Sequence, residues 1–150
     1  MDTSSNVNIG KTTTTLLFIY IISYSLFTSI IMISGWIDTF SFLFSMLQVS
    51  AGFKPQASIV LGFNCILGAI LGGAVLNITS FHRYIAIEKK FDTAHIWGFF
   101  FTPLLSLIVG ILTFCFLQSG LLILNGSQIS TNVNLTSSLG FTAMGAIAGY

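Results

Sequence analysis

Three long runs of this chain contain no charged residue, and this feature limits its fold more than any other. The runs cover about residues 12–37, 57–80 and 96–124. A helix needs about 20 apolar residues to cross the hydrocarbon core of a bilayer, and each run is long enough. A soluble domain has about 25% charged residues on average, whereas this chain has 6%. We therefore expect an integral membrane protein.

A fourth, shorter apolar segment covers about residues 135–150. We predict an all-α fold, with residues 1–150 forming a single transmembrane domain, a bundle of four transmembrane helices. The apolar segment at about residues 40–50 is too short to span, so it predicts a short interfacial or re-entrant segment. Trp36 ends the first span, where an amphipathic ring suits the membrane interface. Pro103 lies within the third span and predicts a kink.

Positive charge is distributed unevenly between the predicted loops. The loop at residues 81–95 carries three of the five lysine and arginine residues, and Lys11 lies on the same side of the membrane. Lys54 alone lies on the opposite side. Because positive residues concentrate in short cytoplasmic loops, we predict that this loop and both the N- and C-termini are cytoplasmic.

Small residues recur at helical spacing in the second, third and fourth predicted spans. Membrane helices associate through close packing because lipid tails are as apolar as leucine, and small side chains permit a close approach of two backbones. The predicted helix-packing residues are Gly68, Gly72, Gly73, Gly98, Ser106, Gly110, Gly145 and Gly149. The pairs Gly68–Gly72 and Gly145–Gly149 form two smooth faces. A chain of this size cannot easily bury both by itself, so we predict a homo-oligomer.

The predicted spans contain no Asp, Glu, Lys, Arg or His. Proton relays and most ion-coupled carriers place such groups within the membrane, so this absence argues against a secondary active transporter. The polar span residues Asn64, Ser106 and Gln118 are candidates for lining a pore. The alternative for Asn64 and Gln118, and for Asn77, is a hydrogen bond to a neighbouring helix.

No catalytic motif is visible in the chain. We find no nucleophile paired with a base and no phosphate-binding loop, so we predict no enzyme activity and no cofactor. Glu88, Asp92 and His95 would share one face of a helix, but without a second pair of ligands they predict no metal site. A net charge of +1 gives no electrostatic reason to expect direct nucleic-acid binding.

A cluster of basic and aromatic residues lies in the predicted cytoplasmic loop, and we call it the basic rim. It consists of His82, Arg83, Tyr84, Lys89, Lys90 and Phe91. Such charges anchor helix ends to the anionic lipid bilayer. The same mixture also suits a protein contact, in which aromatic side chains supply buried area and charges set orientation. The rim therefore predicts a docking site for a soluble cytoplasmic partner protein.

In size and number of spans the chain resembles small four-helix bacterial membrane proteins, such as the membrane subunits of the two-component Kiwa anti-phage systems. The resemblance covers the overall layout, and no site residue is transferred from it. In that family the membrane subunit assembles in the bilayer and recruits a soluble DNA-binding partner. The resemblance implies a bacterial inner (plasma) membrane protein with a role in anti-phage defence.

These observations lead to one main hypothesis and two alternatives. We expect a non-enzymatic membrane scaffold or sensor subunit that self-associates and docks a cytoplasmic partner at the basic rim. The first alternative is an oligomeric pore or membrane-permeability effector. The second alternative is a small transporter subunit.

Overall fold

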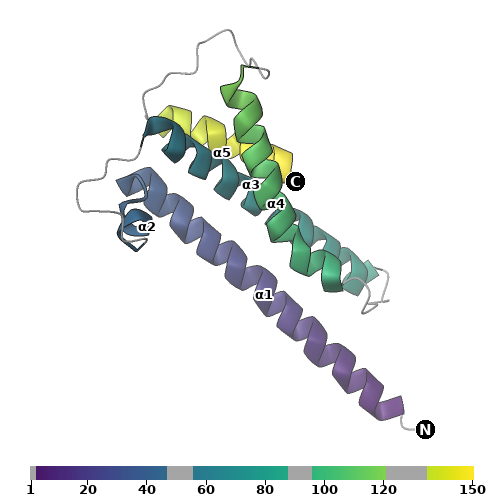
Figure 1. The fold of residues 1–150 in the computed structure, drawn as a ribbon. Coiled ribbons are helices and arrows are strands. Elements are labelled where there is room, and N and C mark those ends of the chain that lie inside the picture. Colours follow the sequence, from purple (N-terminus) through teal and green to yellow (C-terminus); the bar gives the residue numbers. More distant parts are fainter. Residues whose placement is uncertain (1–2, 47–55, 88–95, 121–134) are drawn as a thin grey trace.

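Every element that the structure describes is a helix. The computed structural model of the chain describes residues 3–46, 56–87, 96–120 and 135–150 (Figure 1). The elements in chain order are α1 (Thr3–Asp38), α2 (Ser41–Met46), α3 (Ala57–His82), the π-helix η1 (Arg83–Ile87), α4 (Ile96–Gln118) and α5 (Leu135–Gly149). These ranges contain no strand, so the all-α prediction is confirmed for the part of the chain that they cover.

Three of the helices are long and apolar enough to cross a membrane. The candidate spans are Thr12–Asp38, Ala57–Ile85 and Ile96–Gln118, with 27, 29 and 23 residues. At a rise of 1.5 Å per residue, even the shortest is about 35 Å long and exceeds a hydrocarbon core of about 30 Å. The 15 residues of α5 extend only about 22 Å. By length and composition, α5 is a shorter apolar helix and does not match the other three.

Two helix boundaries differ from those that the sequence predicts. The charge-free run predicts a first span from residue 12, but α1 already begins at Thr3, in the polar segment before that run. The third run extends to residue 124, but α4 ends at Gln118. Gly120 has a φ of 74°, and a glycine in this left-handed conformation commonly ends a helix. Residues 121–134 lie outside the described part of the chain.

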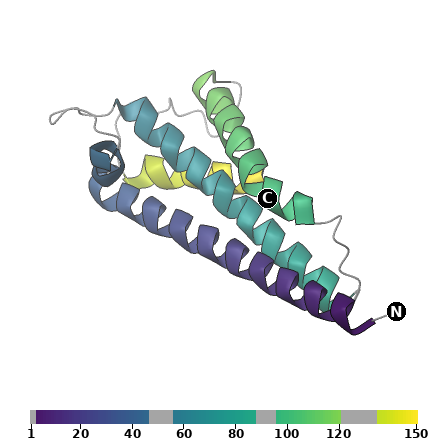
Figure 2. The same cartoon turned by 60° about the horizontal axis from the view of Figure 1, so that its bottom comes forward.

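Helix α3 lies at the centre of the molecule. In its most apolar window 61% of the residues are buried, against 17% in α1 and 22% in α4. Figure 2 shows α1 along one side of α3 and α4 on the other, while α5 passes behind α3. The glycines and alanines of α3 explain this position, because they let several neighbouring helices approach its backbone.

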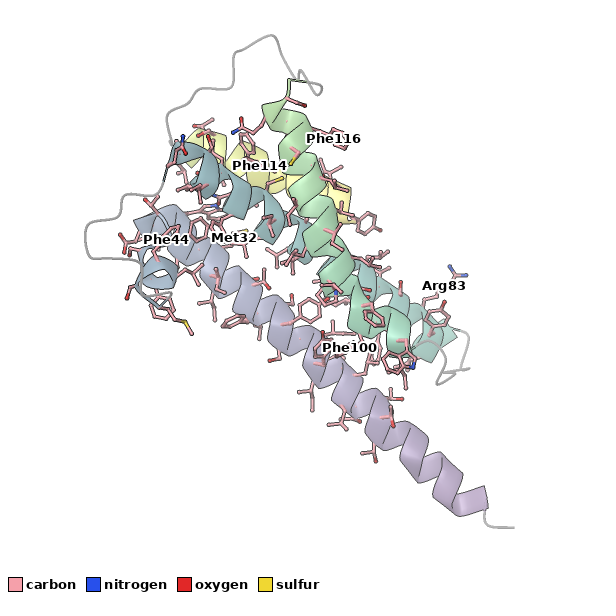
Figure 3. All side chains as sticks on the ribbon, in the orientation of Figure 1. Met32, Phe44, Arg83, Phe100, Phe114 and Phe116 are labelled. Carbon is pink, nitrogen blue, oxygen red and sulfur yellow. The ribbon has the colours of Figure 1, made fainter. Side chains whose placement is uncertain are left out.

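Three clusters of buried side chains join the other helices to α3. The first cluster joins α1, the end of α3 and the start of α4 and contains Leu17, Ile21, Phe81 and Phe99. The second joins α3, α4 and α5 and contains Leu61, Cys65, Leu117 and Phe141. The third joins the α1–α2 corner to α3 and contains Phe40, Val60 and Leu67. Figure 3 shows Phe114 beside the second cluster and Met32 and Phe44 beside the third.

A tight turn between α1 and α2 forms the corner of the fold. Thr39 and Phe40 have φ values of 53° and 61°, a conformation that is rare for residues with large side chains. The turn drives the Phe40 ring into the core, where it is 1% exposed. A Cβ atom at Gly35 would overlap this ring, so Gly35 is the residue that makes room for it. Residues 47–55, which include the end of the predicted interfacial segment, lie outside the described part of the chain.

Most large apolar side chains on the outer faces of α1 and α4 are exposed. On α1 they include Leu16, Leu26, Phe27, Ile30 and Ile37, which are between 60% and 80% exposed. On α4 they include Trp97, Phe100, Leu104, Leu105 and Leu112, which are between 51% and 65% exposed. A surface of this size would aggregate in water, and it suits contact with lipid tails.

Candidate functional site

The described part of the basic rim lies at the end of α3 and the beginning of η1. His82 and Arg83 are exposed, and Figure 3 shows the Arg83 side chain pointing away from the helices. Tyr84 is half-buried, and its ring packs edge-to-face on Phe99 at a centroid distance of 6.2 Å. The structure thus brings these three rim residues together on one short stretch of helix. Lys89, Lys90 and Phe91 lie outside the described residues.

The base of the rim is rigidly packed. Phe81 is 9% exposed and contacts Phe99 edge-to-face at a centroid distance of 6.1 Å. On its other side it stacks on Phe18 of α1 at 5.7 Å. Aromatic pairs of this geometry contribute about 0.5–1.5 kcal/mol beyond the area that they bury. The exposed side chains of His82 and Arg83 therefore follow directly after a closely packed aromatic platform.

A buried amide lies next to this platform. Asn77 of α3 is 4% exposed, and its Nδ2 donates hydrogen bonds to the Tyr24 hydroxyl at 3.0 Å and to the Phe99 carbonyl oxygen at 3.2 Å. One side chain of α3 thus binds α1 and α4 together. We call the contacts of Asn77 with Tyr24 and Phe99 the Asn77 junction.

Pro103 explains why the Phe99 carbonyl accepts a bond from another helix. In an α-helix the N–H of residue 103 would donate to the carbonyl of residue 99, but proline has no N–H and its ring crowds that carbonyl. Prolines are tolerated in membrane helices when a neighbouring helix satisfies the freed carbonyl. Asn77 supplies this donor. The i−4 rule applied to Pro103 could have identified Phe99 as the acceptor from sequence, but it could not have identified Asn77 as the donor.

A second buried amide connects α3 to the other end of α1. Asn64 is 0% exposed; its Oδ1 accepts a bond from Trp36 Nε1 at 3.1 Å, and its Nδ2 donates to the Val60 carbonyl at 2.9 Å. The sequence predicts Trp36 at the membrane interface, but its indole N–H points inward to this amide. The two asparagines are 13 positions apart, which is about 20 Å along the helix.

The three candidate pore-lining residues occupy three different environments. Asn64 is enclosed between α1 and α3. Ser106 is 4% exposed and lies against Gly73 at the contact of α3 with α4. Gln118 is exposed at the end of α4. Within one chain these side chains do not face a common space.

Both G-x-x-x-G pairs are used within the chain, where they pack α3 against α5. A Cβ at Gly68 would overlap the Thr142 carbonyl oxygen, and one at Gly72 would overlap that of Ala146. Reciprocally, a Cβ at Gly145 would overlap the Cys65 carbonyl oxygen, and one at Gly149 would overlap that of Ala69. The expectation that the chain could not bury both faces was wrong, because each pair buries the other.

The small residues of α4 divide into two groups. The Ser106 side chain occupies the space that a Cβ at Gly73 would take. A Cβ at Gly110 would lie 2.8 Å from the Ile66 Cα and 3.0 Å from the Ala69 Cβ. Gly98 is exposed, with no atom of the described residues within 4 Å of a Cβ placed there. Thr102 also lies against α3, since its Cγ2 would be 3.3 Å from a Cβ at Gly73. The small residues of α4 therefore pack on α3 from Thr102 onward, and Gly98 does not take part.

The buried side-chain polar atoms of the described residues all have hydrogen-bond partners. Among these residues there is also no group of three or more His, Cys, Asp and Glu side chains that could hold a metal ion; Glu88, Asp92 and His95 lie outside them. No protein-family model, no curated protein and no solved structure matches this chain.

Proposed function

We propose that this protein is a non-enzymatic membrane scaffold or sensor subunit that docks a cytoplasmic partner at the basic rim. The observation that carries the proposal is the exposure of His82 and Arg83 on an aromatic platform fixed by Phe99. Charged side chains on a rigid base orient a partner with little loss of conformational freedom.

The proposed topology has four spans, with cytoplasmic N- and C-termini and α5 as the fourth span. The directions of the helices support it: α1 and α4 run antiparallel to α3, as the pairs Trp36–Asn64 and Tyr24–Asn77 indicate for α1. Helix α5 runs parallel to α3, because Gly68 and Gly72 meet successively later residues of α5. A helix as short as α5 can be accommodated by local thinning of the bilayer.

Self-association remains part of the proposal, but it has a different basis from the glycine pairs. Since the G-x-x-x-G faces bury each other within the chain, they do not supply a contact between copies. The remaining support is the resemblance to bacterial membrane subunits that assemble in the bilayer. Cross-linking in membranes, followed by sizing in mild detergent, tests for a homo-oligomer directly.

The same resemblance extends the proposal to anti-phage defence in a bacterial inner membrane. In a host that carries this chain and its neighbouring genes, deleting the chain alone should increase the plaque counts of sensitive phages. Re-expression of the wild-type chain should restore protection. Equal plaque counts with and without the chain, across a phage panel, would remove the defence role and leave the scaffold proposal standing.

Affinity purification in mild detergent tests the docking proposal. Wild-type chain should recover a soluble partner at constant stoichiometry, and the double change Lys89→Gln and Lys90→Gln should reduce that recovery at unchanged membrane abundance. Lys54→Gln is the matched control, because it removes one positive charge on the predicted outer side and should leave recovery intact.

The alternative functions make a different prediction for the same experiment. If no partner is recovered with wild-type chain and the purified protein conducts ions in liposomes, the pore alternative replaces the scaffold. If the protein instead carries a small solute across the membrane without conducting ions, the transporter alternative replaces the scaffold. In one chain, the separate positions of Asn64 and Ser106 give these alternatives no support.

A further inference from the structure

The first seven residues of α4 form an arm that is attached differently from the rest of the helix. In this arm, residues 96–102, Phe99 is the only fully buried side chain. Trp97, Phe100 and Phe101 are between 43% and 65% exposed, and Gly98 faces open space. Beyond Pro103, by contrast, α4 has four buried residues in its contact with α3 and α5, namely Ser106, Gly110, Thr113 and Leu117.

Two local features weaken the helix at the junction between the arm and the body. Pro103 removes the hydrogen bond to the Phe99 carbonyl, and kinks in long helices concentrate at such positions. Thr102 Oγ1 donates a bond back to the Gly98 carbonyl at 2.8 Å, a contact that often bends helices. The helix can therefore change direction here at little cost to its own backbone hydrogen bonds.

The arm is attached chiefly through Phe99, while Ile96 packs against the same cluster and Thr102 lies against the position of Gly73. The Phe99 ring packs on Phe81 and Tyr84 at 6.1 and 6.2 Å, and its carbonyl accepts the bond from Asn77. Phe100 adds an outer contact, stacking on Tyr20 of α1 at 5.8 Å. Losing the Asn77 bond would leave the Phe99 carbonyl without this donor, so the closed position would lose the contact that compensates for Pro103.

We propose that residues 96–102 are a hinged arm that swings about Pro103 and that the Asn77 junction latches it closed. An open arm withdraws Phe99 from Phe81 and Tyr84 and so removes the support of the exposed end of α3. The arm is a conformational device of the isolated protein, and it does not depend on which partner the basic rim binds.

Distance measurements between spin labels in lipid nanodiscs test the hinge. All samples carry Cys65→Ala and a label at Val75→Cys, an exposed site on α3. To report the arm, the second label is placed at Gly98→Cys in a chain that also carries Cys115→Ser. To report the body of α4, the second label is placed at the native, exposed Cys115. Asn77→Ala should add a longer-distance population to the 75–98 pair and leave the 75–115 pair unchanged.

Matched variants separate a hinge from general loosening. Asn64→Ala removes a buried amide that bonds to α1 but not to α4, so it should leave both label pairs as in wild type. Pro103→Ala added to Asn77→Ala restores a donor for Phe99 and should remove the longer-distance population. The proposal is overturned if Asn77→Ala leaves the 75–98 distances unchanged, if it shifts both pairs alike, or if Pro103→Ala fails to restore the closed distances.

Discussion

Asn77 on α3 donates a hydrogen bond to the carbonyl of Phe99, the group that Pro103 deprives of its donor within α4. A free carbonyl in a lipid environment costs several kcal/mol, since no water is present to satisfy it. The proline in one helix and the asparagine in another therefore compensate for each other. The same amide donates to Tyr24, so Asn77 also contributes to the contact of α1 with the other two helices.

The pairing predicts a specific pattern of stability losses. Asn77→Ala should destabilise the protein by about 1–2 kcal/mol, because it removes the hydrogen bonds that Asn77 donates to the Phe99 carbonyl and the Tyr24 hydroxyl. In a Pro103→Ala background, the backbone N–H of the introduced alanine can donate to the Phe99 carbonyl. Asn77→Ala should then lower the free energy of unfolding by about 1 kcal/mol less than it does in the wild type. Reversible unfolding in mixed micelles measures all four proteins of the cycle. Additive losses would show that Asn77 and Pro103 are independent.

The chain has two tryptophans in contrasting positions, which makes a matched pair. Trp36→Phe removes the N–H that binds Asn64 and should cost about 0.6–2 kcal/mol of stability. Trp97 is 65% exposed at the start of α4, so Trp97→Phe should change the stability of the fold in micelles by less than about 0.5 kcal/mol. Equal losses would mean that the Trp36–Asn64 bond adds nothing to the contact of α1 with α3.

Two glycines of α5 should respond differently to substitution by alanine. Gly145→Ala places a methyl group on the Cys65 carbonyl and should destabilise the protein by about 1–3 kcal/mol. Gly140 is exposed, with open space around it, so Gly140→Ala should be neutral or should stabilise α5 by up to about 1 kcal/mol. Thermal unfolding in detergent compares the two. A loss for Gly140→Ala would indicate a contact between copies on that face.

Gly72→Leu distinguishes packing within a chain from packing between chains. Because Gly72 meets the backbone of α5, the leucine should separate α5 from α3 and lower the stability of each copy. Cross-linking at matched expression gives the second readout. If folded monomers accumulate while a wild-type ladder of oligomers disappears, then Gly72 also lies between copies.

Cysteine labelling tests the orientation. In a chain without its native cysteines, a cysteine introduced in place of Thr93 should resist an impermeant thiol reagent added to intact cells, whereas one in place of Ser130 should react. The expectation follows from the four lysine and arginine residues predicted inside and the one predicted outside. The reverse pattern would move the basic rim to the outer side and exclude a cytoplasmic partner.

The sequence by itself determined that this chain forms long apolar helices that could cross a membrane. Long runs without charge, such as residues 57–80, are stable in lipid only when every backbone group is bonded internally, and a helix achieves this alone. Length and composition therefore identified α1, α3 and α4. The kink at Pro103 stays a prediction, since α4 runs from Ile96 to Gln118 with Pro103 inside it.

Only the tertiary structure decided which faces meet. Gly98 and Gly145 look equivalent in sequence, but Gly98 faces open space and Gly145 contacts the backbone of Cys65. Hydrophobicity cannot separate them, because in a membrane every face of a helix is apolar and lipid covers it as well as a neighbouring helix does. Shape and hydrogen bonding between residues distant in the chain make the choice, as when Asn77 donates to the carbonyl of Phe99.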